Sequence, residues 1–121
     1  MLVVDDNSVM RKIVRKVLER WSLCIDEGKD GQEAIKMVKD SITKQEEYDV
    51  IIMDMEMPIC DGFQATKEIR DLPVTKHTPI FALTAHIFES AKKQFLEAGG
   101  DDFLTKPLRV ELLKEKIGMY I

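Results

Sequence analysis

Five polar side chains stand where short apolar runs of the sequence end. Asp54 ends one such run, Asp5 and Asp6 follow another, Thr84 ends a third, and Lys106 comes directly after a fourth. Apolar runs of this length are typical of buried β-strands. In an open parallel sheet the carboxyl ends of the strands share one edge, and ligands bind there. We therefore expect three carboxylates, a hydroxyl and an ammonium group to meet at one site.

The three carboxylates would repel one another unless protons or a cation stood between them. A hard divalent ion removes this repulsion, and Mg²⁺ is typically held by one or two carboxylates together with phosphate oxygens. Asp54 is the best candidate nucleophile, because it ends the central strand and a carboxylate can form an aspartyl phosphate. Lys106 and Thr84 could bind the equatorial oxygens of a phosphoryl group. The residues thus predict a magnesium-dependent phosphoryl site formed with Asp5 and Asp6.

Strand-like and helix-like patterns alternate along the chain, which is typical of a parallel sheet covered by helices on both faces. We expect strands at residues 2–5, 23–26, 49–54, 79–83 and 102–105. Helices are expected after residues 7–8, through 34–42, around 65–69, from about 88 to 98, and after 107. The right-handed crossover rule then favours a doubly wound, flavodoxin-like α/β fold with a five-stranded parallel sheet of order 2-1-3-4-5.

The first helix has an apolar stripe and a basic face. The stripe, expected to face the sheet, consists of Val9, Ile13, Val14, Val17, Leu18 and Trp21. The opposite face carries Arg11, Lys12, Arg15, Lys16 and Arg20. Such a basic face is most often solvated.

Length and composition indicate one globular domain spanning residues 1–121, with 45% apolar and 33% charged residues. No run approaches the ~20 apolar residues of a membrane span, so no membrane insertion is expected. The net charge of −4 argues against direct nucleic-acid binding. No signal peptide precedes the first strand, which favours a cytoplasmic location or a domain excised from a longer protein. Cys24 and Cys60 have no metal-type spacing and are expected to be reduced thiols.

Five short motifs occur in a fixed order along the whole chain: residues 3–7 (VVDDN), 53–58 (MDMEMP), 61–62 (DG), 83–85 (LTA) and 103–107 (FLTKP). Together they resemble the receiver domain of two-component response regulators. The Met-Pro pair after the aspartate is further similar to receivers of hybrid histidine kinases and phosphorelays. The resemblance implies a signalling domain that accepts a phosphoryl group from a phosphohistidine of a histidine kinase or histidine-containing phosphotransfer protein. It would promote its own aspartyl phosphorylation and dephosphorylation.

The resemblance also implies a role for each matching residue. Asp54 corresponds to the phosphoacceptor, and Lys106 to the phosphate-binding lysine. Magnesium would be held by Asp54, directly by Asp6, largely through water by Asp5, and by the backbone carbonyl of Glu56. The switch pair would be Thr84, which moves toward the phosphoryl group, and Phe103, whose ring turns inward. In receivers, the first helix and the loop after the fifth strand commonly meet the histidine-containing partner, so the basic face is either solvated or a docking surface.

Two positions depart from the common receiver pattern. Glu56 places a carboxylate where many relatives carry an amide, and Phe103 lacks a tyrosine hydroxyl. We expect phosphoryl lifetime to be the property most affected.

Three other functions compete. One is an interaction domain that does not use phosphorylation, which the complete acidic set argues against. A haloacid-dehalogenase-type phosphohydrolase would need a second Asp where Glu56 stands. A flavodoxin-type electron carrier would need a Ser/Thr/Gly-rich phosphate loop after the first strand.

Overall fold

A computed structural model describes residues 1–19, 25–55, 62–72, 78–84, 89–105 and 109–120 of the chain. Strands and helices alternate in the order β1 (Leu2–Val4), α1 (Ser8–Glu19), β2 (Asp26–Gly28), α2 (Gly31–Thr43), β3 (Ile51–Asp54), α3 (Gly62–Arg70), β4 (Ile80–Thr84), α4 (Glu89–Ala98), β5 (Asp102–Thr105) and α5 (Val110–Tyr120). The strands form one parallel sheet of order β2-β1-β3-β4-β5. The predicted doubly wound fold is confirmed.

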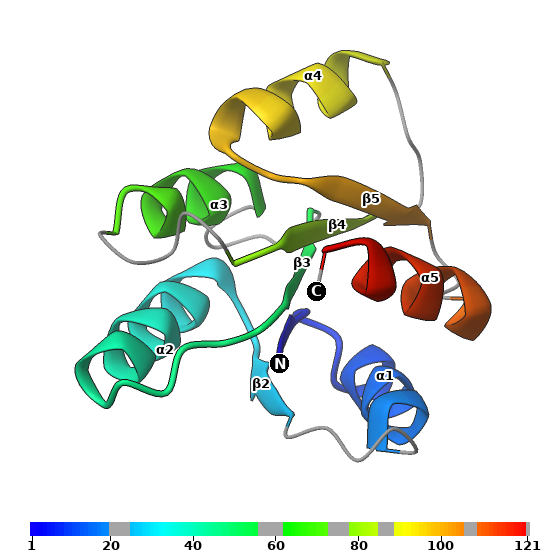
Figure 1. Cartoon of the computed structure of the whole chain (residues 1–121), viewed down its shortest axis with the longest axis horizontal. Helices are drawn as coiled ribbons and strands as arrows, with labels where there is room; N and C mark the ends of the chain where they lie inside the picture. Colours follow the sequence, from blue (N-terminus) through cyan, green and yellow to red (C-terminus); the bar gives the residue numbers. More distant parts are fainter. Residues whose placement is uncertain (20–24, 56–61, 73–77, 85–88, 106–108, 121) are drawn as a thin grey trace.

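Helices cover both faces of the sheet, with α1 and α5 on one face and α2, α3 and α4 on the other (Figure 1). Successive residues of a strand point to opposite faces. Ile51 and Met53 therefore pack into the core beneath α2, α3 and α4, whereas Ile52 packs into the core beneath α1 and α5. Because both faces are covered, β3 is apolar along its length until it reaches Asp54.

The second strand lies later in the sequence than predicted. The expected strand ended at Asp26, but β2 begins there and pairs Asp26, Glu27 and Gly28 with residues 2–4 of β1. Residues 23 and 24 lie outside the described part of the chain. An Asp-Glu-Gly run has little intrinsic strand preference. The position of this strand is therefore determined by backbone pairing with β1, and not by the apolar residues that precede it.

The predicted apolar stripe of the first helix was wrong at its N-terminal end. Val14 is 1% exposed and faces the sheet, whereas Val9 is 61% and Ile13 is 48% exposed. At 3.6 residues per turn, Val9 lies about 140° around the helix from Val14 and so cannot share its face. The basic face also differs from expectation, because the side chain of Arg11 is only 17% exposed.

At the edge of the sheet where β4 and β5 begin, one ion pair joins three elements. Arg70, the last residue of α3, donates from Nε to the Gly99 carbonyl (2.6 Å) and from Nη2 to Asp101 Oδ2 (2.5 Å). The same Asp101 oxygen accepts the backbone N–H of Ile80 (2.9 Å). Burial lowers the pKa of the Arg70 guanidinium, and the neighbouring Asp101 carboxylate opposes that shift. Gly99 has φ +108°, and a Cβ there would meet Arg70 Cγ at 2.3 Å, so this turn requires glycine.

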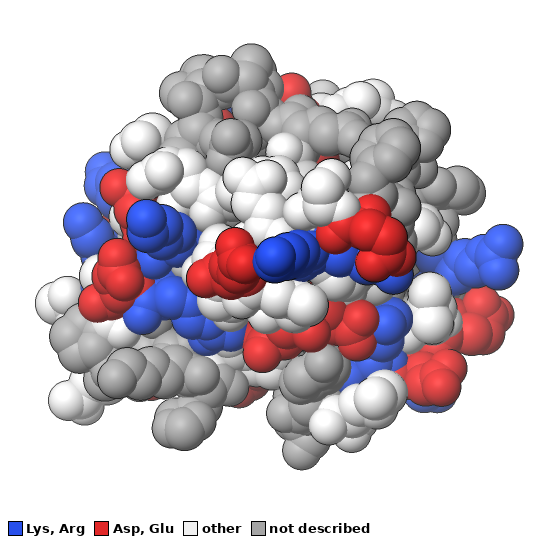
Figure 2. All heavy atoms as spheres, turned by 90° about the horizontal axis from the view of Figure 1, so that it is seen from above, with Lys and Arg blue, Asp and Glu red and all other residues white. Residues whose placement is uncertain are grey.

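None of the described helices is long and apolar enough to cross a membrane. On the face shown in Figure 2, acidic and basic side chains are interleaved.

Candidate acidic phosphoryl site

The loop from β1 to α1 is held by short-range hydrogen bonds around Asp5. The Asp5 N–H donates to the Gly28 carbonyl of β2 (3.0 Å), and Asp5 Oδ1 accepts the Asn7 N–H (2.9 Å). Asn7 Oδ1 in turn accepts the N–H groups of Val9 (2.9 Å) and Met10 (3.3 Å). Asn7 is therefore the N-cap of α1, which begins at Ser8. The loop presents Asp5 and Asp6 at the carboxyl end of β1.

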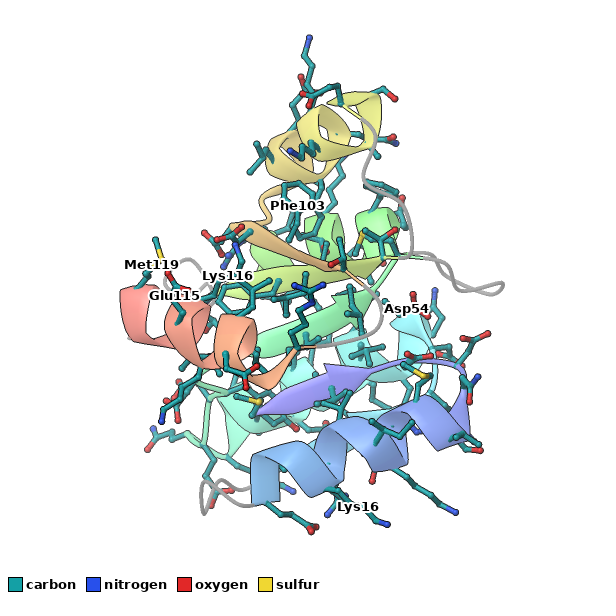
Figure 3. The ribbon with its side chains drawn as sticks, turned by 90° about the vertical axis from the view of Figure 1, so that its right-hand side faces the viewer. Lys16, Asp54, Phe103, Glu115, Lys116 and Met119 are labelled. Atoms are coloured by element: carbon teal, nitrogen blue, oxygen red, sulfur yellow. The ribbon has the colours of Figure 1, made fainter. Side chains whose placement is uncertain are left out.

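The three predicted carboxylates meet at this edge of the sheet. One oxygen atom from each of Asp5, Asp6 and Asp54 lies within 4.8 Å of the other two. Asp5 and Asp54 are each 1% exposed, whereas Asp6 is exposed. The acidic cluster, Asp5, Asp6 and Asp54, thus has two buried members and opens to solvent on the side of Asp6. Figure 3 shows Asp54 at this end of the sheet.

The donor set of the acidic cluster fits magnesium. Carboxylate oxygens are the hard ligands that Mg²⁺ prefers, and their close spacing leaves a mutual repulsion that a divalent cation removes. The exposed Asp6 leaves room for the waters that Mg²⁺ retains and for phosphate oxygens. When bound, such an ion would neutralise charge on the carboxylates and on an incoming phosphoryl group.

Thr84 reaches the same edge from β4. Strand pairing sets Asp54 beside Leu83, so Thr84 is one residue beyond the level of Asp54. On its other side Thr84 pairs with Thr105, the residue before Lys106. Glu56 and Lys106 lie outside the described residues, so their roles stay predictions.

Phe103, the second predicted switch residue, belongs to a row of three rings. Its ring centroid lies 5.2 Å from that of Phe95, with the planes tilted by 58°. The Phe63 ring lies 6.5 Å from Phe95 on the other side, in an edge-to-face arrangement. This aromatic row, Phe63–Phe95–Phe103, joins α3, α4 and β5, and Figure 3 shows Phe103 between β5 and α4. The three rings come from three different elements, so spacing along the chain does not predict this row.

Gly62 is a further residue whose importance the sequence understated. In the sequence it is only the second residue of a two-residue motif, but in the structure it begins α3 directly against the end of β3. A Cβ at Gly62 would lie 2.6 Å from the Asp54 carbonyl oxygen and 2.9 Å from Met55 Cα. Glycine therefore lets α3 approach the backbone that carries Asp54.

Comparisons with known proteins agree with this geometry. The family model of the response regulator receiver domain matches residues 1–118. Two-component response regulator 24 of Arabidopsis thaliana is 38% identical over 99% of this chain and 84% of its own length. Hybrid signal transduction histidine kinase I of Dictyostelium discoideum is 39% identical over 99% of this chain, which spans only 7% of that kinase.

A solved structure shows the same fold together with a metal. The receiver domain of sensor histidine kinase PA1611 from Pseudomonas aeruginosa, with a magnesium ion coordinated in its active site cleft, superposes with a TM-score of 0.85. The match has 30% identity and covers 98% of this chain and 93% of that one. With its sheet order, its acidic cluster and these relatives, the chain belongs to the family of response regulator receiver domains.

Proposed function

We propose that residues 1–121 form one receiver domain in which Asp54 accepts a phosphoryl group from a phosphohistidine in a magnesium-dependent reaction. The donor is a histidine kinase or a histidine-containing phosphotransfer protein. The observation that carries the proposal is the acidic cluster, in which Asp54 lies at the buried end and Asp6 at the open end. A donor phosphate entering past Asp6 would approach the Asp54 carboxylate from solvent.

In the transfer, a carboxylate oxygen of Asp54 attacks phosphorus while the bond from phosphorus to the donor imidazole nitrogen breaks. The electron pair of that bond returns to the imidazole. Asp54 is placed for this step by β3, which is buried along its whole length and fixes its backbone. Thr84 and Lys106 bind the equatorial oxygens, where negative charge must be stabilised.

Phosphorylation then changes the conformation on the β4–β5 side of the sheet. The Thr84 hydroxyl moves toward the new phosphoryl group. The ring of Phe103 then turns toward the space that Thr84 has left. Because the Phe103 ring contacts Phe95, this movement alters the packing of α4. The effect of phosphorylation at the acidic cluster is thereby transmitted to the surface of α4.

The docking surface for the histidine-containing partner is the exposed side of α1. Val9 and Ile13 lie one turn apart there, and the two side chains are 61% and 48% exposed. Lys12 and Lys16, which are also exposed, add positive charge on the same helix. An apolar pair flanked by lysines supports contact with another protein over simple solvation.

The proposed function is tested with a small phosphoryl donor. With excess acetyl phosphate and magnesium, intact-mass analysis should show one added phosphoryl group, which accumulates and is acid-labile. Excess chelator should prevent the modification, because the acidic cluster then repels the anionic donor. A phosphohydrolase would instead consume acetyl phosphate rapidly. An interaction domain that does not use phosphorylation would neither accumulate a phosphoryl group nor consume the donor.

Thr84→Ala should separate phosphorylation from the conformational change. The variant loses a hydrogen bond to a charged oxygen, which is worth about 1.5–3 kcal/mol. The equilibrium constant for the change from the resting to the switched conformation should therefore fall by a factor of about ten or more. Amide spectra with and without beryllofluoride measure the shift near Phe103 and in α4. Thr84→Ser, which keeps the hydroxyl, serves as the control. Equal spectral changes in Thr84→Ala and the wild type would contradict this role.

A further inference from the structure

Arg11 reaches from α1 to the backbone of the acidic loop. Its Nη1 donates to the carbonyl oxygen of Asp5 at 2.7 Å, and its own backbone N–H donates to the Asn7 carbonyl at 3.1 Å. The side chain is only 17% exposed, so most of it is removed from solvent. The sequence had placed Arg11 on a basic surface, whereas in the structure it is directed toward the site.

The guanidinium of Arg11 is itself fixed by β2. Its Nε lies 3.3 Å from Glu27 Oε1, and the other oxygen of Glu27 accepts from Arg15 Nε at 2.8 Å. Arg15 Nη2 also donates to the Ile25 carbonyl at 3.0 Å. Glu27 pairs with Val3 in the sheet, so its backbone is rigidly placed. The two arginines and Glu27 form a clamp, Arg11–Glu27–Arg15, that joins α1 to β2 beside the acidic loop.

The bond to the Asp5 carbonyl fixes the peptide unit that links Asp5 to Asp6. A peptide unit is planar, so holding its oxygen also sets the direction in which the chain enters Asp6. Asp5 itself is held by its bonds to Gly28 and Asn7. Arg11 therefore holds the peptide unit between the buried ligand, Asp5, and the exposed ligand, Asp6.

We propose that Arg11 is a positioning residue for the metal site, holding the Asp5–Asp6 peptide so that both carboxylates face Asp54, with Glu27 and Arg15 fixing its guanidinium. This inference rests on the proposed function, in which the acidic cluster binds Mg²⁺. Groups that orient metal ligands without touching the metal typically change its affinity about 10- to 100-fold when removed.

The sign of the effect distinguishes positioning from simple electrostatics. A guanidinium near a cation site repels the cation, so its charge alone would weaken Mg²⁺ binding. Removing Arg11 would then tighten binding if only its charge mattered. Positioning predicts the opposite, because the ligands lose their alignment.

The experiment measures Mg²⁺ affinity by calorimetry, without any phosphoryl donor. Arg11→Lys keeps the charge but loses the planar fork that reaches Glu27 and the Asp5 carbonyl together, and it should bind Mg²⁺ about tenfold more weakly. Arg11→Gln should also bind more weakly, despite losing the repelling charge. Lys12→Gln removes the same charge from the exposed neighbouring position and should stay within about twofold of the wild type. In the metal-free protein, the amide resonances of Asp6 and Asn7 should move in Arg11→Lys and stay in place in Lys12→Gln.

The proposal is overturned if Arg11→Lys binds Mg²⁺ within twofold of the wild type, or if Arg11→Gln binds it more tightly. Should the Arg11 variants fail to fold, Glu27→Gln decides, because it leaves Arg11 intact and weakens its anchor. A severalfold loss of Mg²⁺ affinity in Glu27→Gln supports the clamp, and unchanged affinity overturns it. Failure of the wild type itself to bind Mg²⁺ would instead refute the proposed function.

Discussion

Asp54→Asn should abolish phosphorylation by acetyl phosphate and by any phosphohistidine donor. A carboxamide lacks the anionic oxygen that attacks phosphorus, and the change also removes one of the three carboxylates of the acidic cluster. We expect the wild type to gain one phosphoryl group in magnesium and the variant to gain none. Intact-mass analysis under acid-free conditions measures both.

The matched control is Asp49→Asn. Asp49 is exposed and precedes the other end of β3, so the variant makes the same chemical change far from the site. It should be phosphorylated like the wild type. Undiminished acid-labile phosphate on Asp54→Asn would show that another residue is the phosphoacceptor.

Phe95→Ala should be the most destabilising of the variants considered. Phe95 is 1% exposed and is the middle ring of the aromatic row. A Cβ on Gly100 would lie 2.1 Å from the Phe95 ring, so the turn after α4 is packed directly against it. Truncating a buried phenylalanine to alanine costs about 3–5 kcal/mol, a large part of the total stability of a domain of this size. Urea unfolding measures the loss.

Leu96→Ala is the control for Phe95→Ala, because Leu96 is the next residue and is 53% exposed. Leu96→Ala should lower the free energy of unfolding by about 0.5 kcal/mol. In Phe95→Leu, which keeps much of the apolar volume, the Phe103 ring should lose its tilted contact with the Phe95 ring and reorient more freely. If Phe95→Ala lowered the free energy of unfolding by less than about 1 kcal/mol, this would contradict the packing described for the aromatic row.

The sequence predicted the fold well because most of its elements carry their own local signal. Apolar runs identify β1, β3 and β4, and the right-handed connection rule orders them without any knowledge of side-chain contacts. The acidic cluster was predictable for the same reason, since Asp54 ends β3, Asp5 and Asp6 directly follow β1, and parallel strand ends share an edge.

Features that depend on contacts between distant elements were not predictable. β2 consists of Asp-Glu-Gly, and only pairing with β1 makes it a strand. Val9 and Ile13 are apolar and lie one turn apart, but the side of α1 that packs on the sheet is centred nearer Val14, and the sequence does not show which side that is. The bond from Arg11 to the Asp5 carbonyl links residues six apart through a backbone atom, and side-chain patterns carry no information about it.

The two outer strands of the sheet bear on how this domain can meet other proteins. β2 has three residues and begins with Asp26 and Glu27, while β5 has four and begins with Asp102, which is paired with Lys116 of α5 at 2.7 Å. Short outer strands that carry charges are poor templates for the backbone of another chain. Extension of the sheet from one molecule into the next is therefore disfavoured, and we expect partner proteins to contact side chains on the helices and loops instead.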